Sequence, residues 1–444
     1  MKIFIIGDNT CAELLAESLS DASHDVTVIG ENPLKLAHIE GKADVTVIES
    51  SLTNPTLFTE LQAQETDLIL CVSLKDESNI TACLLGRNTF QIPSSICLLR
   101  SNLYEKKDSL LPFDHNHLIL NPNKLASQSL VHLLNHPGSH EVVKLEEQGL
   151  VVITTPIHKS TPICGQKITE LESLLQAPSQ ILAVIRNAEP QPLDKKLILQ
   201  ENDYIIFAEP FESKNQTLSK IIGKNQTYQS IMITGATPIA EDLIQHLKNA
   251  SYYVILIEKD YTKAANFAEK FPQITVLHAD PNDTELLENE NIEQKDVFLA
   301  LSEDDEDNLV SALQAKTYQV PLIVTVTQQP RLVPIIEKNQ IHAAIAPESM
   351  LAKNILNHLQ HPQIIHAQAL RKHGGHILVV QVPKKLADKT VQDICLPLHA
   401  ICFGLQRGKK IIQVTGKSAF QDGDLVCLYT PEDEDIGKIT HCFT

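Results

Sequence analysis

Short apolar runs alternate with helical patterns along the first part of the chain. A representative helical stretch places Ala12, Leu14, Leu15 and Leu19 on one face. The apolar runs are short enough to be strands, and they lie at Lys2–Ile6, Val26–Ile29, Val45–Ile48, Asp67–Ser73, Ser95–Arg100 and Leu118–Leu120. Strands that alternate with helices at this spacing predict a parallel, doubly wound α/β sheet.

The same pattern returns in the second half of the chain. The stretch that begins at Lys2 is repeated from Ser230, and Gly235 follows Gly7 by 228 positions (235 − 7). The expected strands are Ile231–Thr234, Val254–Glu258, Ile274–His278, Asp296–Leu301 and Leu322–Val326. A repeat of this length predicts two copies of one supersecondary unit, and therefore two Rossmann-like domains in tandem.

A different pattern follows each α/β segment. Short apolar runs with few helical stretches predict a small α+β domain after each of the breaker pairs His136-Pro137 and His361-Pro362. The first of these domains is expected to use strands at Glu141–Leu145, Leu150–Pro156, Gln180–Arg186, Lys196–Leu199 and Tyr204–Phe207. The expected domains are 1–137, 138–212, 230–361 and 362–444, with a polar linker at 213–229.

Two glycine turns carry the candidate chemistry. In a dinucleotide-binding unit a G-x-G-x-x-G turn holds the phosphates at a helix N-terminus, and an acid at the end of the second strand holds the ribose. The first copy has Gly7, Asn9 and Ala12 at the glycine positions, and Gly30 stands where the ribose acid is expected, one residue before Glu31.

The second copy departs from the fingerprint differently. It has Gly235, Thr237 and Ala240 at the glycine positions, and an acid, Glu258, ends the second strand in register. Pro238 removes one amide that could have contacted phosphate. The second half is therefore expected to hold a ribose more firmly than the first, whereas the proline weakens its phosphate turn.

A second pair of segments supports the duplication. The pattern S-x-x-D-E-x-N occurs at Ser73–Asn79 and at Ser302–Asn308, 229 positions apart (308 − 79). Ser73 and Ser302 follow apolar strands, at the edge where open α/β sheets bind ligands. A ligand contact is one interpretation of each serine and stays open. The acids that follow are interpreted as helix-start residues, because acids suit the first turn of a helix.

Composition limits the classes of function. The net charge of −18 disfavours nonspecific binding to nucleic acid or anionic lipid. No apolar run is long enough for a membrane span, no signal-peptide pattern precedes Lys2, and the nine cysteines form no C-x-x-C pair. Several cysteines lie in apolar runs, which predicts buried, reduced thiols. No metal-ligand spacing and no catalytic motif is found in the sequence.

The ordered duplication resembles the peripheral subunits of bacterial Trk potassium-uptake systems, which carry two RCK (regulator of K⁺ conductance) modules per chain. The resemblance implies a non-enzymatic regulatory subunit on the cytoplasmic face of the membrane. It implies a homo-oligomeric ring, a dimer or a tetramer, and a membrane-embedded potassium channel or transporter as the partner. The implied ligand is NAD(H), with ATP or ADP as alternatives, and the second half is favoured over the first.

The resemblance and the two turns together select candidate binding residues in both halves. In the first half these are Gly7, Asn9, Glu31, Ser73 and Arg100, and in the second half Gly235, Thr237, Glu258, Asp280 and Ser302. The resemblance places Arg100 near ligand phosphate and Asp280 near adenine, and Val326 is expected in the place of Arg100 in the second half. A surface ion pair for Arg100 and a simple loop acid for Asp280 remain open.

Two other functions remain open at this point. Because both turns lack glycines, the chain could be an RCK scaffold that has lost nucleotide binding in one or both halves. An NAD-dependent oxidoreductase would need a His, Lys or Tyr placed to transfer a proton, and the short duplicated domains offer no such constellation.

Overall fold

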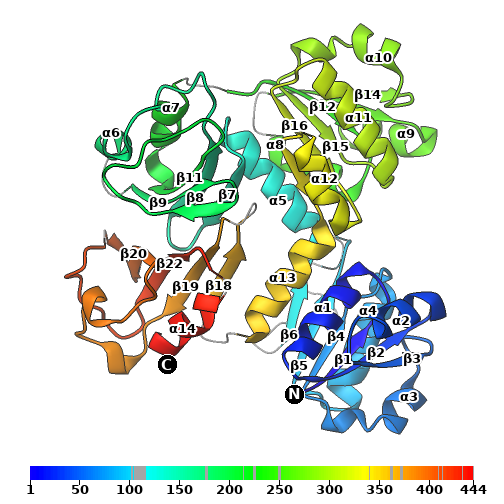
Figure 1. Ribbon diagram of the computed structural model, residues 1–444. Helices are drawn as coiled ribbons and strands as arrows, with labels where there is room; N and C mark the ends of the chain where they lie inside the picture. The colour runs from blue at the N-terminus through cyan, green and yellow to red at the C-terminus, as the bar shows by residue number, and fades with distance from the viewer. Residues whose placement is uncertain are drawn as a thin grey trace. The chain divides into compact units, whose positions relative to one another are not determined.

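The chain forms two compact units (Figure 1). The first contains residues Met1–Gln128 and Gln229–Ala352, and the second contains Ser129–Tyr228 and Lys353–Thr444. The computed structural model describes all residues except 102–103, 105–116, 176–178, 214, 224–226, 249–251, 340, 361–363, 371–373, 409, 413, 433 and 444. Below, N-domain 1 denotes residues 1–128 and N-domain 2 denotes residues 229–352.

N-domain 1 is a six-stranded parallel sheet in the order β3-β2-β1-β4-β5-β6. Its strands are β1 (Lys2–Ile6), β2 (Asp25–Gly30), β3 (Thr46–Glu49), β4 (Leu68–Cys71), β5 (Ser94–Leu98) and β6 (His117–Leu120). Its helices are α1 (Thr10–Asp21), α2 (Pro33–Glu40), α3 (Pro55–Glu60), α4 (Asp76–Leu84) and the start of α5 (Pro122–Asn135). Strand order and parallel pairing confirm the predicted doubly wound Rossmann-like fold.

N-domain 2 has the equivalent order, β14-β13-β12-β15-β16-β17, again all parallel. Its strands are β12 (Ser230–Thr234), β13 (Tyr253–Glu258), β14 (Thr275–His278), β15 (Val297–Ala300), β16 (Leu322–Val326) and β17 (Ala343–Ile345). Its helices are α8 (Pro238–Leu247), α9 (Tyr261–Lys270), α10 (Thr284–Asn289), α11 (Asp305–Thr317), α12 (Val333–Lys338) and the start of α13 (Pro347–Gln360). The two halves are therefore copies of one fold, as predicted.

The second unit contains two antiparallel five-stranded sheets of matching order, β10-β9-β11-β8-β7 and β21-β20-β22-β19-β18. The first uses β7 (Glu141–Leu145), β8 (Leu150–Pro156), β9 (Gln180–Arg186), β10 (Glu189–Gln191) and β11 (Tyr204–Pro210), with α6 (Ile168–Leu174) and α7 (Gln216–Ile222). The second uses β18 (Ile364–Ala369), β19 (His376–Gln381), β20 (Ile401–Arg407), β21 (Lys410–Ile412) and β22 (Leu425–Thr430), with α14 (Glu434–Phe443).

One hydrophobic core joins the two sheets of the second unit. Val152 and Ile206 from the first sheet belong to the same buried cluster as Val379 and Tyr429 from the second. Each sheet also has one bidentate ion pair, Arg186–Asp203 in the first and Arg407–Asp424 in the second. The small α+β domains thus share the duplication of the N-domains.

The S-x-x-D-E-x-N segments hold neighbouring strands together. Asn79 is fully buried, donates to the carbonyl oxygens of Ser73 and Leu98 at 2.9 Å each, and accepts from the Ser73 amide at 2.9 Å. Asn308 makes the same three contacts, with Ser302 and Val326, at 2.8–3.0 Å. The asparagine therefore ties the end of one strand to the end of the next in both copies.

Helices α5 and α13 are exchanged between the two N-domains. Ser127 on α5 donates to the carboxylate of Asp242 on α8, so the helix that leaves N-domain 1 packs on N-domain 2. Glu348 in the first turn of α13 contacts Asn9 and Arg100, so the helix that leaves N-domain 2 packs on N-domain 1. This exchange holds the two N-domains together as one compact unit.

Two local expectations need correction. The polar segment 213–229 is not a simple linker, because it contains helix α7, whose Leu218 and Ile221 are buried in the core of the first α+β sheet. The expected strand at Lys196–Leu199 is wrong; the structure has only an isolated bridge between Ile198 and Lys167 there. The boundary at His361-Pro362 lies outside the described residues.

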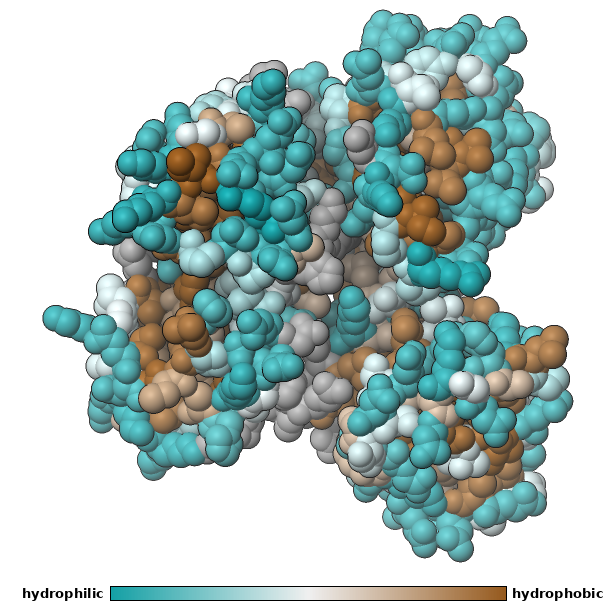
Figure 2. All heavy atoms as spheres, in the orientation of Figure 1, coloured by the Kyte–Doolittle hydropathy of each residue, from teal (hydrophilic) through white to brown (hydrophobic). Residues whose placement is uncertain are grey.

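The distribution of hydrophilic and hydrophobic residues agrees with what the composition predicts. Hydrophilic residues predominate on the face drawn in Figure 2, with hydrophobic patches between them. Within the described residues, none of the helices combines the length and the apolar composition needed to span a bilayer. Cys71, Cys97 and Cys427 are buried free thiols, as predicted.

Candidate functional site

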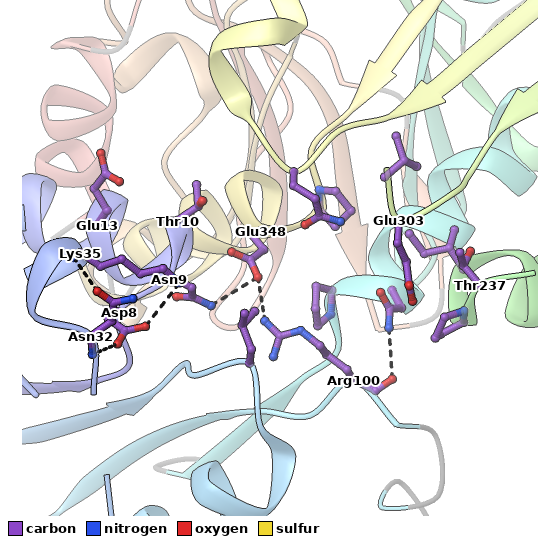
Figure 3. Close-up of a pocket in the computed structure, with 18 of the residues that line it drawn as sticks. Asp8, Asn9, Thr10, Glu13, Asn32, Lys35, Arg100, Thr237, Glu303 and Glu348 are labelled. Carbon is purple, nitrogen blue, oxygen red and sulfur yellow. Dashed lines mark hydrogen bonds and ion pairs between the residues drawn. The ribbon is translucent and has the colours of Figure 1, made fainter. Parts of the chain in front are cut away.

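A cavity of about 870 Å³ lies between the two N-domains, at the carboxyl ends of both parallel sheets. It is lined by both glycine-turn regions and by the first residues of the exchanged helices α5 and α13 (Figure 3). Of the candidate residues, Asn9, Arg100, Thr237 and Ser302 are among those that line it. The structure therefore brings residues of both halves, far apart in sequence, to one hollow where open α/β sheets bind ligands.

Both turns require glycine for the same reason. Gly7 has φ +141°, and a Cβ there would lie 2.8 Å from the Ser73 amide nitrogen. Gly235 has φ +96°, and a Cβ there would lie 2.6 Å from the Ser302 amide nitrogen. In each half the first strand turns directly against the backbone that follows the fourth strand, so a side chain would push these strands apart.

At the second glycine position, the residue caps the helix. Asn9 is the N-cap of α1, and its Oδ1 accepts from the Ala12 amide at 3.1 Å. Thr237 is the N-cap of α8, and its Oγ1 accepts from the Ala240 amide at 3.4 Å. Asn and Thr at this position therefore satisfy a helix-start amide that has no intrahelical partner.

The acid of the ribose position differs between the halves. In N-domain 2, Glu258 is buried; its Oε2 accepts from the Ala236 amide in the turn at 2.6 Å, and its Oε1 accepts from the Asp260 amide at 2.8 Å. In N-domain 1 the acid is in the turn itself: Asp8 Oδ2 accepts from the amides of Glu31 and Asn32 at 3.0 and 2.9 Å. In each half one carboxylate thus connects the turn to the end of the second strand. It comes from the turn in N-domain 1 and from the strand end in N-domain 2.

The Asp8 carboxylate explains the absence of an acid at Gly30. A Cβ at Gly30 would lie 2.9 Å from Asp8 Cβ and 2.9 Å from Leu36 Cδ2. The place that an acid at the strand end would take is filled by Asp8, which also lies 3.7 Å from Lys35 Nζ. An acid at Gly30 would therefore collide with Asp8 rather than restore a ribose contact.

Glu348 brings a carboxylate to the N-terminus of α1. Its Oε2 accepts from the Cys11 amide at 3.3 Å. Its Oε1 accepts from Asn9 Nδ2 at 3.3 Å and from Arg100 Nη2 at 2.8 Å (Figure 3). The Glu348 side chain is 10% exposed and that of Arg100 is 20% exposed. The pKa of the Cys11 thiol is raised, mainly because the thiol is buried and, to a smaller extent, because the Glu348 carboxylate is close to it.

Arg100 contacts the backbone of N-domain 1, and its counterpart in N-domain 2 differs from the residue that we expected. Its Nη1 donates to the Ser73 carbonyl at 2.7 Å, and its backbone amide donates to Asp76. In N-domain 2 the amide of Gln328 donates to Asp305 in the same way. Gln328, not Val326, therefore takes the place of Arg100, and the pairing of Arg100 is with a buried glutamate rather than with a surface acid.

The remaining candidates have local partners. Ser73 Oγ and Ser302 Oγ each accept from the amide two residues later, at 3.2 Å, in matching turns. Glu31 forms a 3.1 Å ion pair with Lys75, and Asp280 accepts from the Asn282 amide at 2.8 Å. These contacts neither require nor prevent a ligand role, which stays a prediction for these residues.

Sequence reasoning missed Asp8, Asn123 and Glu348. Asp8 follows Gly7 directly, so an acid one residue from the turn was a detectable substitute for the acid missing at Gly30. Asn123 and Glu348 follow the prolines that open α5 and α13, but only the exchange of these helices brings them to the cavity. Within the described ranges, no three His, Cys, Asp or Glu side chains are grouped to hold a metal ion.

Comparison with known proteins agrees with this architecture. Two matches to the TrkA-N domain cover residues 3–117 and 231–347. Two curated relatives are named Trk system potassium uptake protein TrkA. The protein from Vibrio alginolyticus is 26% identical over 100% of this chain and 98% of its own length. That from Haemophilus influenzae is also 26% identical, with the same coverage.

Solved structures show the same fold. The GsuK RCK domain has a TM-score of 0.64 at 18% identity, covering 100% of this chain and 94% of that chain. A GsuK channel bound to NAD has a TM-score of 0.64 at 18% identity, covering 100% of this chain and 78% of that chain. Because the two TrkA-N matches together span more than half of the chain, and both fall on Rossmann-like domains of the expected topology, the protein belongs to the TrkA-N domain family.

Proposed function

We propose that this protein is the cytoplasmic regulatory subunit of a Trk-type potassium uptake system. It binds a nucleotide, NAD(H) or an adenine nucleotide, in the cavity between the N-domains and transmits that binding to a membrane-embedded potassium channel or transporter subunit. The observation that carries the proposal is the 870 Å³ cavity at the carboxyl ends of two parallel sheets, with both glycine turns on its wall.

The named relatives support the transport role, and one related structure supports the ligand. Full-length relatives are potassium uptake proteins by name, and the GsuK channel has been solved with NAD bound. In N-domain 2, the glycine turn and the amides at the N-terminus of α8 fit a phosphate group. Glu258 is not among the residues that line the cavity, but it ends β13, where a Rossmann-like domain places the ribose acid. Each of its carboxylate oxygens accepts from a backbone amide and keeps a second lone pair for a hydroxyl group.

The mechanism is coupling rather than chemistry. A ligand shifts the balance between two arrangements only by the difference in its affinity for them. A cavity whose walls come from both N-domains meets this condition, since a change in the spacing of the N-domains changes the ligand's contacts. The subunit acts as a homo-oligomer, a dimer or tetramer arranged as a ring on the inner face of the membrane, because the regulated channel is symmetric.

The test combines a binding and a transport measurement. Ligand binding to the native state raises its stability, so NAD⁺, NADH, ATP and ADP are compared by thermal shift. Glu258→Gln should weaken nucleotide binding by about tenfold in titration calorimetry, because a charge-assisted hydrogen bond is lost. Glu269→Gln, the same change at an exposed acid on α9 of N-domain 2, is the matched control. Potassium flux through the reconstituted membrane subunit should then depend on both this protein and the nucleotide.

A scaffold without nucleotide binding is the second candidate. It is favoured by the filled positions in N-domain 1, where Asp8 and Glu348 occupy the places of ribose and phosphate contacts. This candidate predicts no thermal shift with any of the four nucleotides, together with normal potassium flux. An NAD-dependent oxidoreductase is the weakest candidate. His38 and Lys35 line the cavity and could transfer a proton, but they belong to N-domain 1, the half without an acid at the ribose position, and they pair with Glu13 and Asp8.

A further inference from the structure

The N-terminus of α1 in N-domain 1 already holds an anion that belongs to the protein. Glu348 Oε2 accepts from the amide of Cys11, the second residue of α1, at 3.3 Å. The first amides of a helix have no intrahelical acceptor, and the helix dipole makes this end favourable for negative charge. Glu348 therefore lies where a Rossmann-like domain places the phosphates of its ligand.

The contacts of Glu348 are those that a phosphate oxygen would make. Arg100 donates to its Oε1 at 2.8 Å, Asn9 donates to the same atom at 3.3 Å, and the helix amide donates to Oε2. The site thus offers a guanidinium, a side-chain amide and a backbone amide to one anion. A phosphate group and the Glu348 carboxylate compete for the same donors and repel each other.

In N-domain 2 the counterparts of Glu348 and Arg100 are neutral, and the acid that lines the cavity there, Glu303, pairs with Lys263 at 3.1 Å. Asn123 corresponds to Glu348 in sequence, because each directly follows the proline that opens an exchanged helix. Asn123 also lines the cavity, and its Nδ2 donates to the Arg100 carbonyl oxygen at 3.3 Å. Gln328 corresponds to Arg100, since both donate a backbone amide to the first-turn acid of the preceding helix, α11 or α4. Among the described residues, no carboxylate accepts from the amide of Ile239, the second residue of α8.

We propose that Glu348 and Asn123 determine which N-domain accepts nucleotide phosphate. The Glu348 carboxylate excludes phosphate from the N-terminus of α1, and the neutral Asn123 leaves the N-terminus of α8 accessible. The chain therefore binds one nucleotide, in N-domain 2, despite its two glycine turns. This inference rests on the proposed nucleotide-binding function and adds the residues that select the half.

The experiment counts binding sites by titration calorimetry with ADP as the probe. The wild-type chain should bind one ADP. Glu348→Gln keeps the size of the side chain and an oxygen that accepts from Arg100, but removes the charge, so it should bind two. Asn123→Glu places a carboxylate at the N-terminus of α8 and should weaken the wild-type site at least tenfold. The double variant should bind one ADP again, now in N-domain 1.

A folding check and a second variant accompany these measurements. Circular dichroism and the thermal midpoint establish that each variant is folded. If Glu348→Gln does not fold, Glu348→Met combined with Arg100→Met removes both charges of the pair and should also open N-domain 1, with lower affinity because the guanidinium is gone. The appearance of a second site in either variant supports the exclusion by Glu348.

The outcomes separate this inference from the proposed function. A wild-type chain that binds one ADP and a folded Glu348→Gln that still binds one would overturn the inference while leaving nucleotide binding intact. A wild-type chain that binds two ADP overturns it as well. If the wild type binds no ADP and Glu348→Gln binds one, the result contradicts binding in N-domain 2 but supports the exclusion of phosphate by Glu348. No binding by any variant overturns both.

Discussion

N-domain 1 and N-domain 2 share strand order, register and the buried asparagine tie, yet their ligand edges carry different charges. In N-domain 1 the turn contributes Asp8, and Glu348 and Arg100 form an ion pair at the helix N-terminus. In N-domain 2 the strand end contributes Glu258, while Asn123 and Gln328 are neutral. The duplicated fold is therefore retained where side chains hold strands together and diverges where a ligand would bind.

The divergence shows that one structural requirement has two solutions. The turn after the first strand and the end of the second strand need a hydrogen-bonded link, because both present backbone amides. A carboxylate placed on either side provides it: Asp8 from the turn, or Glu258 from the strand end. A missing acid in a fingerprint therefore indicates a rearranged link as readily as a lost ligand.

The largest expected effect concerns the buried asparagine that both N-domains share. Asn79→Ala and Asn308→Ala each remove three hydrogen bonds to buried backbone groups. Each should lower the free energy of unfolding by roughly 3–4 kcal/mol, because unsatisfied buried groups cost about 1–3 kcal/mol each. Denaturant titration measures the change. A loss in one half without a similar loss in the other would contradict the structural equivalence.

The second prediction tests where the halves differ. Arg100→Met leaves the Glu348 carboxylate partly buried without its cation and should cost about 2–3 kcal/mol, less than for a fully buried pair because both groups keep some solvent contact. Gln328→Met changes an exposed residue and should stay within about 0.5 kcal/mol. Adding Glu348→Met to Arg100→Met should restore part of the loss. Equal effects of the two single variants would refute the assigned asymmetry.

The third prediction concerns the acid that lies in the turn in N-domain 1 and at the end of the second strand in N-domain 2. Gly30→Glu alone should destabilise the chain by about 1–3 kcal/mol, since its Cβ would crowd Asp8 and Leu36. Adding Asp8→Ala reproduces the Ala236 and Glu258 pair of N-domain 2 and should recover most of that loss. Thermal or denaturant unfolding gives the comparison. If the two substitutions simply add, the carboxylates do not substitute for one another.

The smallest effect concerns helix caps. Asp304 is the N-cap of α11 and accepts from the amides of Asp307 and Glu306, which holds its pKa below the usual range. The corresponding residue of α4, Lys75, makes no capping hydrogen bond from its side chain. Asp304→Ala should therefore lower the thermal midpoint slightly, and Lys75→Ala should not.

The pH dependence of the Asp304 effect follows from the direction of the pKa shift. A carboxyl whose folded-state pKa is depressed stabilises the protein above its unfolded pKa, near 3.9, and that contribution is lost as pH falls through the folded value. The difference between wild type and Asp304→Ala should therefore be constant near neutrality and decrease below about pH 4. A difference that grows on acidification would contradict the cap.

Much of the fold was readable from the sequence, because it depends on local pattern. Apolar periodicity located the strands of N-domain 1 and those of N-domain 2 except β17, whose three residues are too short a run to detect. The offset shared by the glycine turns and the asparagine segments predicted the duplication. Helix α7 was missed because its segment is mostly polar, and its two buried residues, Leu218 and Ile221, are too few to produce a clear helical pattern. So short a helix is recognised only once the structure shows which of its residues pack into the core.

The candidate site was readable only in part. Gly7 and Gly235 were predictable because a close backbone approach allows no side chain, and that constraint is local to the turn. The neighbours of Arg100 were not predictable, because Glu348 lies 248 residues away and reaches it through an exchanged helix. The sequence by itself determined two Rossmann-like copies with glycine turns; the tertiary structure decided which turn faces a carboxylate, because charge at a helix N-terminus depends on what packs there in space.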